Sequence, residues 1–149
     1  MLLTELYDNP LPFKMKVTGG GTGKDAVADV VISGRKIRFT GEQHGKNWSL
    51  MFSERQGGED VYDLTGHGDE VKIFSTLKKF TQELINRFEC PKIVFTADKT
   101  EEAGQKRADL YYKMFQRFNF TGYKLHRTPS KTLDTFQLVR DGEEPNKYD

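Results

Sequence analysis

The chain has 149 residues, of which 36% are hydrophobic and 30% charged, a balance typical of one ordinary globular domain. Its 23 lysines and arginines against 22 aspartates and glutamates leave a net charge of +1, which excludes a strong overall field for nucleic acid or an anionic membrane. A single cysteine excludes an internal disulfide, and the first residues have neither the basic start of a signal peptide nor the length of a membrane span. We therefore expect a soluble cytoplasmic protein.

The first half of the chain is predicted to form an antiparallel sheet. Ser33, Gly34 and Arg35 join two β-favouring runs tightly enough for a hairpin, and side chains from Trp48 to Ser53 alternate between apolar and polar, as in a half-buried strand. Residues 55–60 have the composition of a loop. Five runs are expected as strands: residues 13–17, 26–33, 36–40, 48–53 and 61–65.

The glycine-rich run GGGTGK, residues 19–24, invites comparison with a phosphate-binding P-loop. That motif requires a serine or threonine where Asp25 stands, and it must open a helix. Here a β-branched run follows instead. We interpret residues 19–24 as a flexible turn.

The second half changes to helical spacing. Apolar residues recur at three- and four-residue steps from Asp69 to Phe88, which predicts an amphipathic helix. Residues 92–97 form a short apolar run typical of a buried strand, expected to lie parallel to residues 61–65 through a right-handed crossover. A second helix is predicted from Thr100 to about Phe118, followed by two strands: residues 123–127 and 132–140.

These elements predict an α+β fold with a mixed, mostly antiparallel sheet and two long helices. We expect a single domain over residues 13–140, an N-terminal extension over residues 1–12 and a disordered polar tail over residues 141–149.

A glycine turn between residues 61–65 and the first helix is the strongest candidate for a binding site. Gly66 and Gly68 flank His67, so a ligand can approach the N–H groups at the helix start closely. Such a turn suits a phosphate-bearing anion. The same pattern also suits a plain strand-to-helix corner that binds nothing.

The order of elements over residues 13–140 resembles the GNAT acyltransferase superfamily. The family's turn motif [RQ]xxGx[GA] meets the run from Asp63 to Gly68, with both glycines kept and Asp63 in place of Arg or Gln. The resemblance implies that this turn holds acetyl-CoA, with one residue beside the pantetheine arm and five around the pyrophosphate. These residues are Leu64 for the arm and Thr65, Gly66, His67, Gly68 and Asp69 for the pyrophosphate.

A second match lies in the later helix, where the family pattern NxxAxxLYxxxGF keeps Leu110 and Tyr111. Gly104 and Arg107 replace its Asn and Ala, and Phe115 stands where its Gly belongs. In many members this tyrosine protonates the departing CoA thiolate, so the resemblance implies that Tyr111 is the general acid. A Leu-Tyr pair on an amphipathic helix is equally a core-packing pair.

Two functions are compatible with this resemblance. One is transfer of an acetyl group from acetyl-CoA to an unknown amine on a small molecule or a protein. The other is a catalytically inactive GNAT-like binding or virion-associated protein, favoured by the carboxylates of Asp63, Asp69 and Glu70 beside the turn. The chain looks similar to small phage-encoded GNAT-like proteins, which would place it in the host cytoplasm or the virion.

The remaining polar residues carry weaker signals. The three histidines, His44, His67 and His126, lack metal-ligand spacing, so no metal site is expected. Cys90 is interpreted as a buried or inert thiol. Two basic clusters, around Arg35 and around Arg127, resemble solvated faces more than a nucleic-acid site. Four loop carboxylates are open candidates for a general base or for simple solvation: Glu42, Glu54, Glu59 and Asp60.

Overall fold

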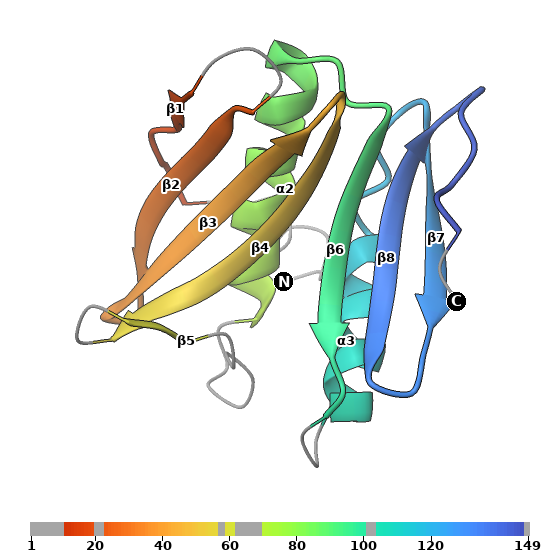
Figure 1. Cartoon of the computed structure of the whole chain (residues 1–149). Coiled ribbons are helices and arrows are strands. Elements are labelled where there is room, and N and C mark those ends of the chain that lie inside the picture. Colours follow the sequence, from red (N-terminus) through yellow and green to blue (C-terminus); the bar gives the residue numbers. More distant parts are fainter. Residues whose placement is uncertain (1–10, 20–22, 57–58, 62–69, 101–103, 148–149) are drawn as a thin grey trace.

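The computed structural model describes residues 11–19, 23–56, 59–61, 70–100 and 104–147. They form the predicted α+β fold, with two helices, α2 (Glu70–Arg87) and α3 (Gly104–Gln116), behind one mostly antiparallel sheet (Figure 1). The sheet order is β1-β2-β3-β4-β6-β8-β7, and β5 pairs with β4 outside this path. The strands are β1 (Lys16–Thr18), β2 (Asp25–Ile32), β3 (Arg35–His44), β4 (Asn47–Gln56), β5 (Glu59–Val61), β6 (Lys92–Asp98), β7 (Tyr123–Pro129) and β8 (Leu133–Arg140).

The hairpin of β2 and β3 forms where the sequence predicts it. Ser33 and Gly34 at its turn have φ angles of 51° and 78°, the two successive positive values that a tight hairpin turn requires. Strand β3 continues to His44, beyond the predicted end at Thr40, because it pairs with β2 and β4 along its length. The antiparallel half of the sheet is thus built from local pairings.

Strand β4 is longer than predicted, and the loop expected over residues 55–60 is wrong for residues 55–56 and 59–60, while residues 57–58 lie outside the described residues. The strand runs on to Gln56, and the chain then turns back as β5, where Val61 pairs antiparallel with Glu54. The composition RQGGED favours a loop, but pairing with a neighbouring strand outweighs local propensity.

The parallel partner of β6 also differs from the prediction. Trp48 pairs with Ile93 and Ser49 with Val94, so β6 lies beside β4. Of the strand expected over residues 61–65, Val61 belongs to β5, and residues 62–65 lie outside the described residues. Beyond the two pairs, β4 and β6 diverge toward their carboxyl ends (Figure 1).

Helix α2 is enclosed on several sides. Helices that pack against one sheet bury a single stripe, yet here five successive residues are buried: Ile73, Phe74, Ser75, Thr76 and Leu77. Residues 11–15 supply part of the cover, since the Leu11 N–H donates to Thr76 Oγ1 at 3.2 Å and the Phe13 ring lies 6.0 Å from that of Phe80. Helix α3 flanks α2 through Phe74 and Phe115, whose ring centroids are 5.4 Å apart.

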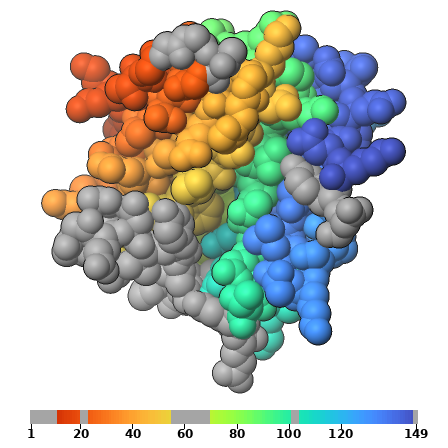
Figure 2. All heavy atoms as spheres, in the orientation of Figure 1, coloured from red at the N-terminus to blue at the C-terminus, as the bar shows by residue number. Residues whose placement is uncertain are grey.

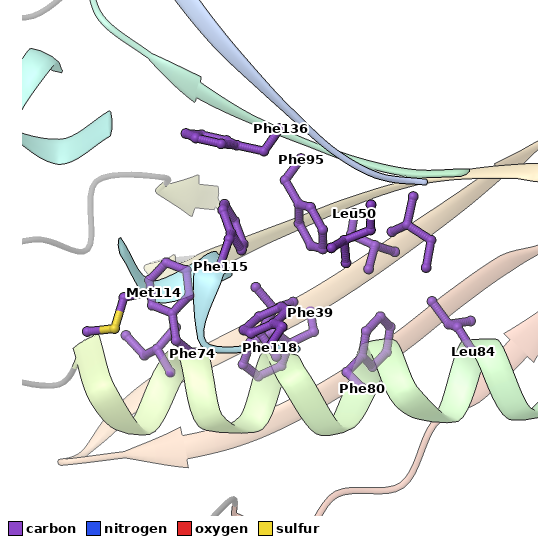
Figure 3. Packing of buried hydrophobic residues seen from close by; sticks show 14 of the residues in the cluster. Phe39, Leu50, Phe74, Phe80, Leu84, Phe95, Met114, Phe115, Phe118 and Phe136 are labelled. Atoms are coloured by element: carbon purple, nitrogen blue, oxygen red, sulfur yellow. The ribbon is translucent and has the colours of Figure 1, made fainter. Parts of the chain in front are cut away.

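The core between sheet and helices is largely aromatic (Figure 3). Phe115 of α3 lies at its centre, with its ring centroid 4.5 Å from Phe95 of β6 and 5.0 Å from Phe136 of β8. Burial of a phenylalanine side chain stabilises a fold by about 1.5–3 kcal/mol. These rings therefore join α3 to the second half of the sheet.

The segment after β8 returns over the sheet face that points toward the viewer in Figure 1, called here the front face. Phe136 faces the helices, so the next side chain, Gln137, points to the front face. Its Nε2 donates to the Asn146 carbonyl at 2.9 Å, and the Asn146 N–H donates to its Oε1 at 2.8 Å. Lys92 adds a bond to Asn146 Oδ1 at 3.0 Å.

Candidate functional site

The divergence of β4 and β6 leaves a break in the middle of the sheet. Residues 50–52 of β4 pair with β3 on one side, and residues 95–98 of β6 pair with β8, but no described strand pairs with either stretch across the break. We call this break the β4–β6 gap. Strand edges of this kind present backbone N–H and C=O groups to an incoming chain or ligand.

The starts of both described helices lie at the wide end of the β4–β6 gap. Because β4 and β6 are parallel, their carboxyl ends lie at the same edge of the sheet. Helix α2 begins there at Glu70 and α3 begins at Gly104 (Figure 1). The positive ends of two helix dipoles thus point toward this edge.

Aromatic rings line the helix side of the β4–β6 gap. The Tyr111 ring centroid lies 5.7 Å from that of Phe52 on β4 and 5.1 Å from that of Phe74 on α2. Phe52 and Phe74 are themselves 5.4 Å apart, nearly perpendicular. Tyr111 is only 6% exposed, so its phenol is held among apolar rings.

From the front face the surface is hollowed between β4 and β6, and atoms in the blue-green of α3 are visible in the hollow (Figure 2). Met51 and Thr96 are exposed side chains of these strands, since alternation along each strand turns them away from the helices. The two faces of the β4–β6 gap therefore differ in exposure, with aromatic rings on the helix side and exposed side chains, among them the charged Asp98, on the front face.

The sequence-predicted cofactor residues fall outside the described part of the chain: Leu64, Thr65, Gly66, His67, Gly68 and Asp69. Their neighbour Glu70 is described and begins α2, half-buried. Tyr111 is described and lies at the helix side of the β4–β6 gap, where it also satisfies the core-packing interpretation.

The candidate general bases are placed as follows. Glu54, near the end of β4, accepts hydrogen bonds from Arg35, whose Nε lies 2.8 Å from its Oε1, and the two side chains are 13% and 14% exposed. Glu42 is more exposed and lies 3.7 Å from His44. Glu59 and Asp60 belong to β5. Of the four, Glu54 is the one that belongs to the same strand as Phe52.

The arginines of the two basic clusters are paired with acids. Arg35 pairs with Glu54, and Arg38 pairs with Asp29 at 2.8 Å. Arg127 pairs with two carboxylates, Asp109 and Asp134. These pairs leave no concentrated positive field at the named arginines.

One buried charge cluster was missed by the sequence analysis. The Asp134 side chain on β8 is fully buried, and its oxygens lie 2.6 Å from Lys99 Nζ and 2.5 Å from an Arg127 nitrogen. Burial by itself raises the pKa of Asp134, but hydrogen bonds from Lys99 and Arg127 outweigh it and hold that pKa below its ordinary value. The available signal was a lone acidic residue in the β-favouring run from Leu133 to Val139.

Arg127 of this cluster fixes α3 against the sheet. Its guanidinium donates to Asp109 of α3 at 2.8 Å and lies 4.9 Å from the ring centroid of Tyr112. The hydrogen bond from Arg127 lowers the pKa of the Asp109 carboxyl. Asp109 and Tyr112 lie in the same turn of α3 as Tyr111, so Arg127 holds that turn of the helix against β7 and β8.

Cys90 is buried, as predicted, and its pKa is raised to about 12 by burial, which the charge of Arg140 offsets only in part. At pH 8 its thiolate fraction is roughly a thousandfold below that of an ordinary thiol. We expect a disulfide reagent at pH 8 to label the folded protein only as fast as it unfolds. Labelling of native protein at the rate seen in denaturant would contradict this burial.

Neither a metal cluster nor a membrane-spanning helix is found within the described residues. They contain no group of three or more His, Cys, Asp or Glu arranged to hold a metal ion. None of the described helices is long and apolar enough to cross a membrane.

Comparison with known proteins found no relative of this chain. No protein-family model matches it, and no curated protein or solved structure is significantly similar.

Proposed function

We propose that the chain is a GNAT-like N-acyltransferase that uses acetyl-CoA to acetylate an amine. The sheet order supports this assignment, because four antiparallel strands are followed by a helix, a strand parallel to the fourth, a second helix and a closing antiparallel pair. This order agrees with the resemblance in the sequence. Strand β5 is an addition to the pattern, placed before α2.

The observation that carries the proposal is the β4–β6 gap. In open sheets, ligands bind beyond the carboxyl ends of parallel strands at the point where the strand order switches. Here the only described parallel pairing, at Trp48 and Ser49, ends at such a point. The strands then separate toward two helix starts.

The described residues fit the pantetheine arm of acetyl-CoA. The arm is extended and carries two amides, which suit the strand edges of residues 50–52 and 95–98. Its apolar segments suit the rings of Phe52 and Tyr111. The residues proposed to hold the pyrophosphate are those of the glycine turn, from Thr65 to Asp69, with Leu64 beside the arm.

Acetyl-CoA supplies a thioester whose carbonyl carbon accepts the nitrogen of a neutral amine. The carbon–nitrogen bond forms, the carbon–sulfur bond breaks, and the amine loses one proton to solvent. Tyr111 donates its phenolic proton to the departing sulfur and regains one from solvent. The surrounding rings exclude water, which limits hydrolysis of the thioester. The acceptor is a small-molecule or protein amine in the cytoplasm.

A catalytically inactive GNAT-like binding module is the second candidate. It is favoured by the burial of Tyr111, which is 6% exposed within a cluster of phenylalanines, and by the Glu70 carboxylate in the first turn of α2. In this form the protein would bind a protein partner, in the host cytoplasm or in a phage particle. Binding and turnover experiments separate the two candidates.

Titration with acetyl-CoA and with CoA tests the proposal directly. A ligand that binds only the folded state stabilises it by about 2.7 kcal/mol at a hundredfold excess over Kd, and the melting temperature rises further as the ligand concentration increases. We expect this shift in the wild type and its loss in Gly66→Asp, which adds a side chain and a charge to the glycine turn. Absence of any shift at millimolar acetyl-CoA would reject cofactor binding.

Tyr111→Phe separates binding from chemistry. We expect it to bind acetyl-CoA as the wild type does, because the ring contacts with Phe52 and Phe74 remain. Release of CoA in the presence of an amine mixture should fall by about 10²–10⁴-fold, the usual contribution of a general acid. Equal rates of CoA release in the two proteins would remove Tyr111 from the mechanism.

A further inference from the structure

Four aromatic rings form a continuous wall at the helix side of the β4–β6 gap. This ring wall consists of Phe52, Phe74, Tyr111 and Phe115, drawn from β4, α2 and α3. Its ring centroids are separated by 5.1 Å (Phe74–Tyr111), 5.4 Å (Phe52–Phe74 and Phe74–Phe115), 5.7 Å (Phe52–Tyr111) and 6.4 Å (Tyr111–Phe115). At these separations aromatic rings are in contact.

Phe74 is the centre of the ring wall. Like Tyr111, it contacts the three other rings, but it is 1% exposed against 6% for Tyr111, whereas Phe52 is half-buried at the edge toward the gap. Behind Phe74, Phe115 continues the contacts to Phe95 at 4.5 Å. Of the two fully buried phenylalanines of the wall, Phe74 lies nearer to Tyr111, at 5.1 Å against 6.4 Å for Phe115.

The chemistry of acyl transfer places the acyl chain at this wall. The inference rests on the proposed function, in which the Tyr111 hydroxyl lies within hydrogen-bond reach of the thioester sulfur. The acyl carbonyl carbon is bonded to that sulfur, so the remainder of the acyl chain starts beside the neighbours of Tyr111. Those neighbours are Phe52, Phe74 and Phe115.

We infer that the ring wall restricts the acyl donor to short acyl groups and that Phe74 sets the limit. A two- or three-carbon group ends at the faces of Phe52 and Tyr111. A six-carbon chain must displace the Phe74 ring, which is in contact with Tyr111 on one side and Phe115 on the other. Rings fixed by a packed core do not yield such space freely.

The test compares acetyl-CoA and hexanoyl-CoA on the wild type, on Phe74→Ala and on the milder Phe74→Leu. We expect the wild type to bind acetyl-CoA at least about tenfold more tightly than hexanoyl-CoA, since pockets discriminate single methylenes by tenfold or more. Phe74→Ala should remove or reverse this preference for acetyl-CoA, while its affinity for free CoA stays that of the wild type. Phe74→Leu, which keeps more of the core volume, should shift the ratio in the same direction and by less.

Phe80→Ala is the matched control. Phe80 lies on the same helix and is fully buried, but its ring contacts are with Phe13 and Phe39. This variant removes the same side chain from the same core, so its loss of stability is comparable, and its acetyl-to-hexanoyl ratio should equal that of the wild type.

The outcomes distinguish the inference from the proposed function. If CoA binds and the wild type takes acetyl-CoA and hexanoyl-CoA equally, the ring wall sets no limit and the proposed function stands. If Phe74→Ala and Phe80→Ala change the ratio equally, the effect is one of stability and the assignment of Phe74 is overturned. If CoA itself does not bind, both are overturned.

Discussion

Replacement of Asp134 by alanine is expected to destabilise the fold by roughly 3–5 kcal/mol, the usual cost of removing one partner from a buried ion pair. The Asp134 side chain is fully buried, and Lys99, only 8% exposed, lies 2.6 Å away. Arg127 keeps a second carboxylate, Asp109, so Lys99 is the cation left without a described counter-charge. Denaturant unfolding at pH 7 measures the loss.

The same substitution should change how stability depends on pH. Because the pKa of Asp134 is lower in the folded than in the unfolded chain, its contribution is complete at neutral pH. It is lost as the pH falls below about 4 and through the folded pKa. We therefore expect the free-energy difference between wild type and Asp134→Ala to shrink between pH 7 and pH 3. A constant difference across this range would contradict the ion-pair account.

Two variants control this prediction. Asp29→Ala removes a carboxylate that pairs with Arg38 on the surface, where the two side chains are 56% and 35% exposed, and it should cost less than about 1 kcal/mol. The double variant Lys99→Met with Asp134→Leu removes both charges and should recover most of the stability, because apolar pairs of similar volume often replace buried ion pairs without loss.

Gly104→Ala is expected to destabilise the fold by roughly 1–3 kcal/mol, the usual cost of inserting a methyl group into a packed site. A Cβ at residue 104 would lie 2.4 Å from Lys99 Cα and 2.8 Å from the Lys99 carbonyl carbon. Both atoms belong to the backbone, so the connection from β6 to α3 must shift. The expected loss of stability is opposite to the effect of helix propensity, which favours alanine over glycine.

Gly23→Ala is the control for this effect. A Cβ at residue 23 meets nothing within 4 Å, so the substitution should be neutral or slightly stabilising. Because Gly104 packs on the backbone of Lys99, a double variant with Asp134→Ala should lose less stability than the two single losses together. Additive losses would mean that Gly104 and the Lys99–Asp134 pair act independently.

Local patterns were sufficient for most of the fold. Alternation from Trp48 to Ser53 predicts the buried face of β4, and the three- and four-residue spacing after Asp69 predicts α2 within one or two residues of its ends. The pairing of β4 with β6 was missed, because residues 48–49 and 93–94 meet only in the folded sheet. The continuation of β4 to Gln56 was also missed, because the composition of residues 55–60 favours a loop.

The candidate site was predicted less completely. The Leu110–Tyr111 pair, which resembles a GNAT pattern, drew attention to Tyr111, and the structure places that ring against Phe52 of β4. The burial of Thr76 and the contacts of Asp134 could not be predicted, because their partners, Leu11 for the one and Lys99 for the other, are supplied by distant segments. Helical spacing alone predicts that Ser75 and Thr76 are exposed, whereas both are buried.

The hydrogen bonds between Gln137 and Asn146 also govern how the protein should be mounted on a sensor surface. Asn146 lies over the front face, so a tag added after residue 149 begins within a few residues of that face. A chip loaded through such a tag would turn the β4–β6 gap toward the support and slow ligand access. Biotin attached at Lys72, exposed on α2 behind the sheet, would orient the gap toward the flowing solution.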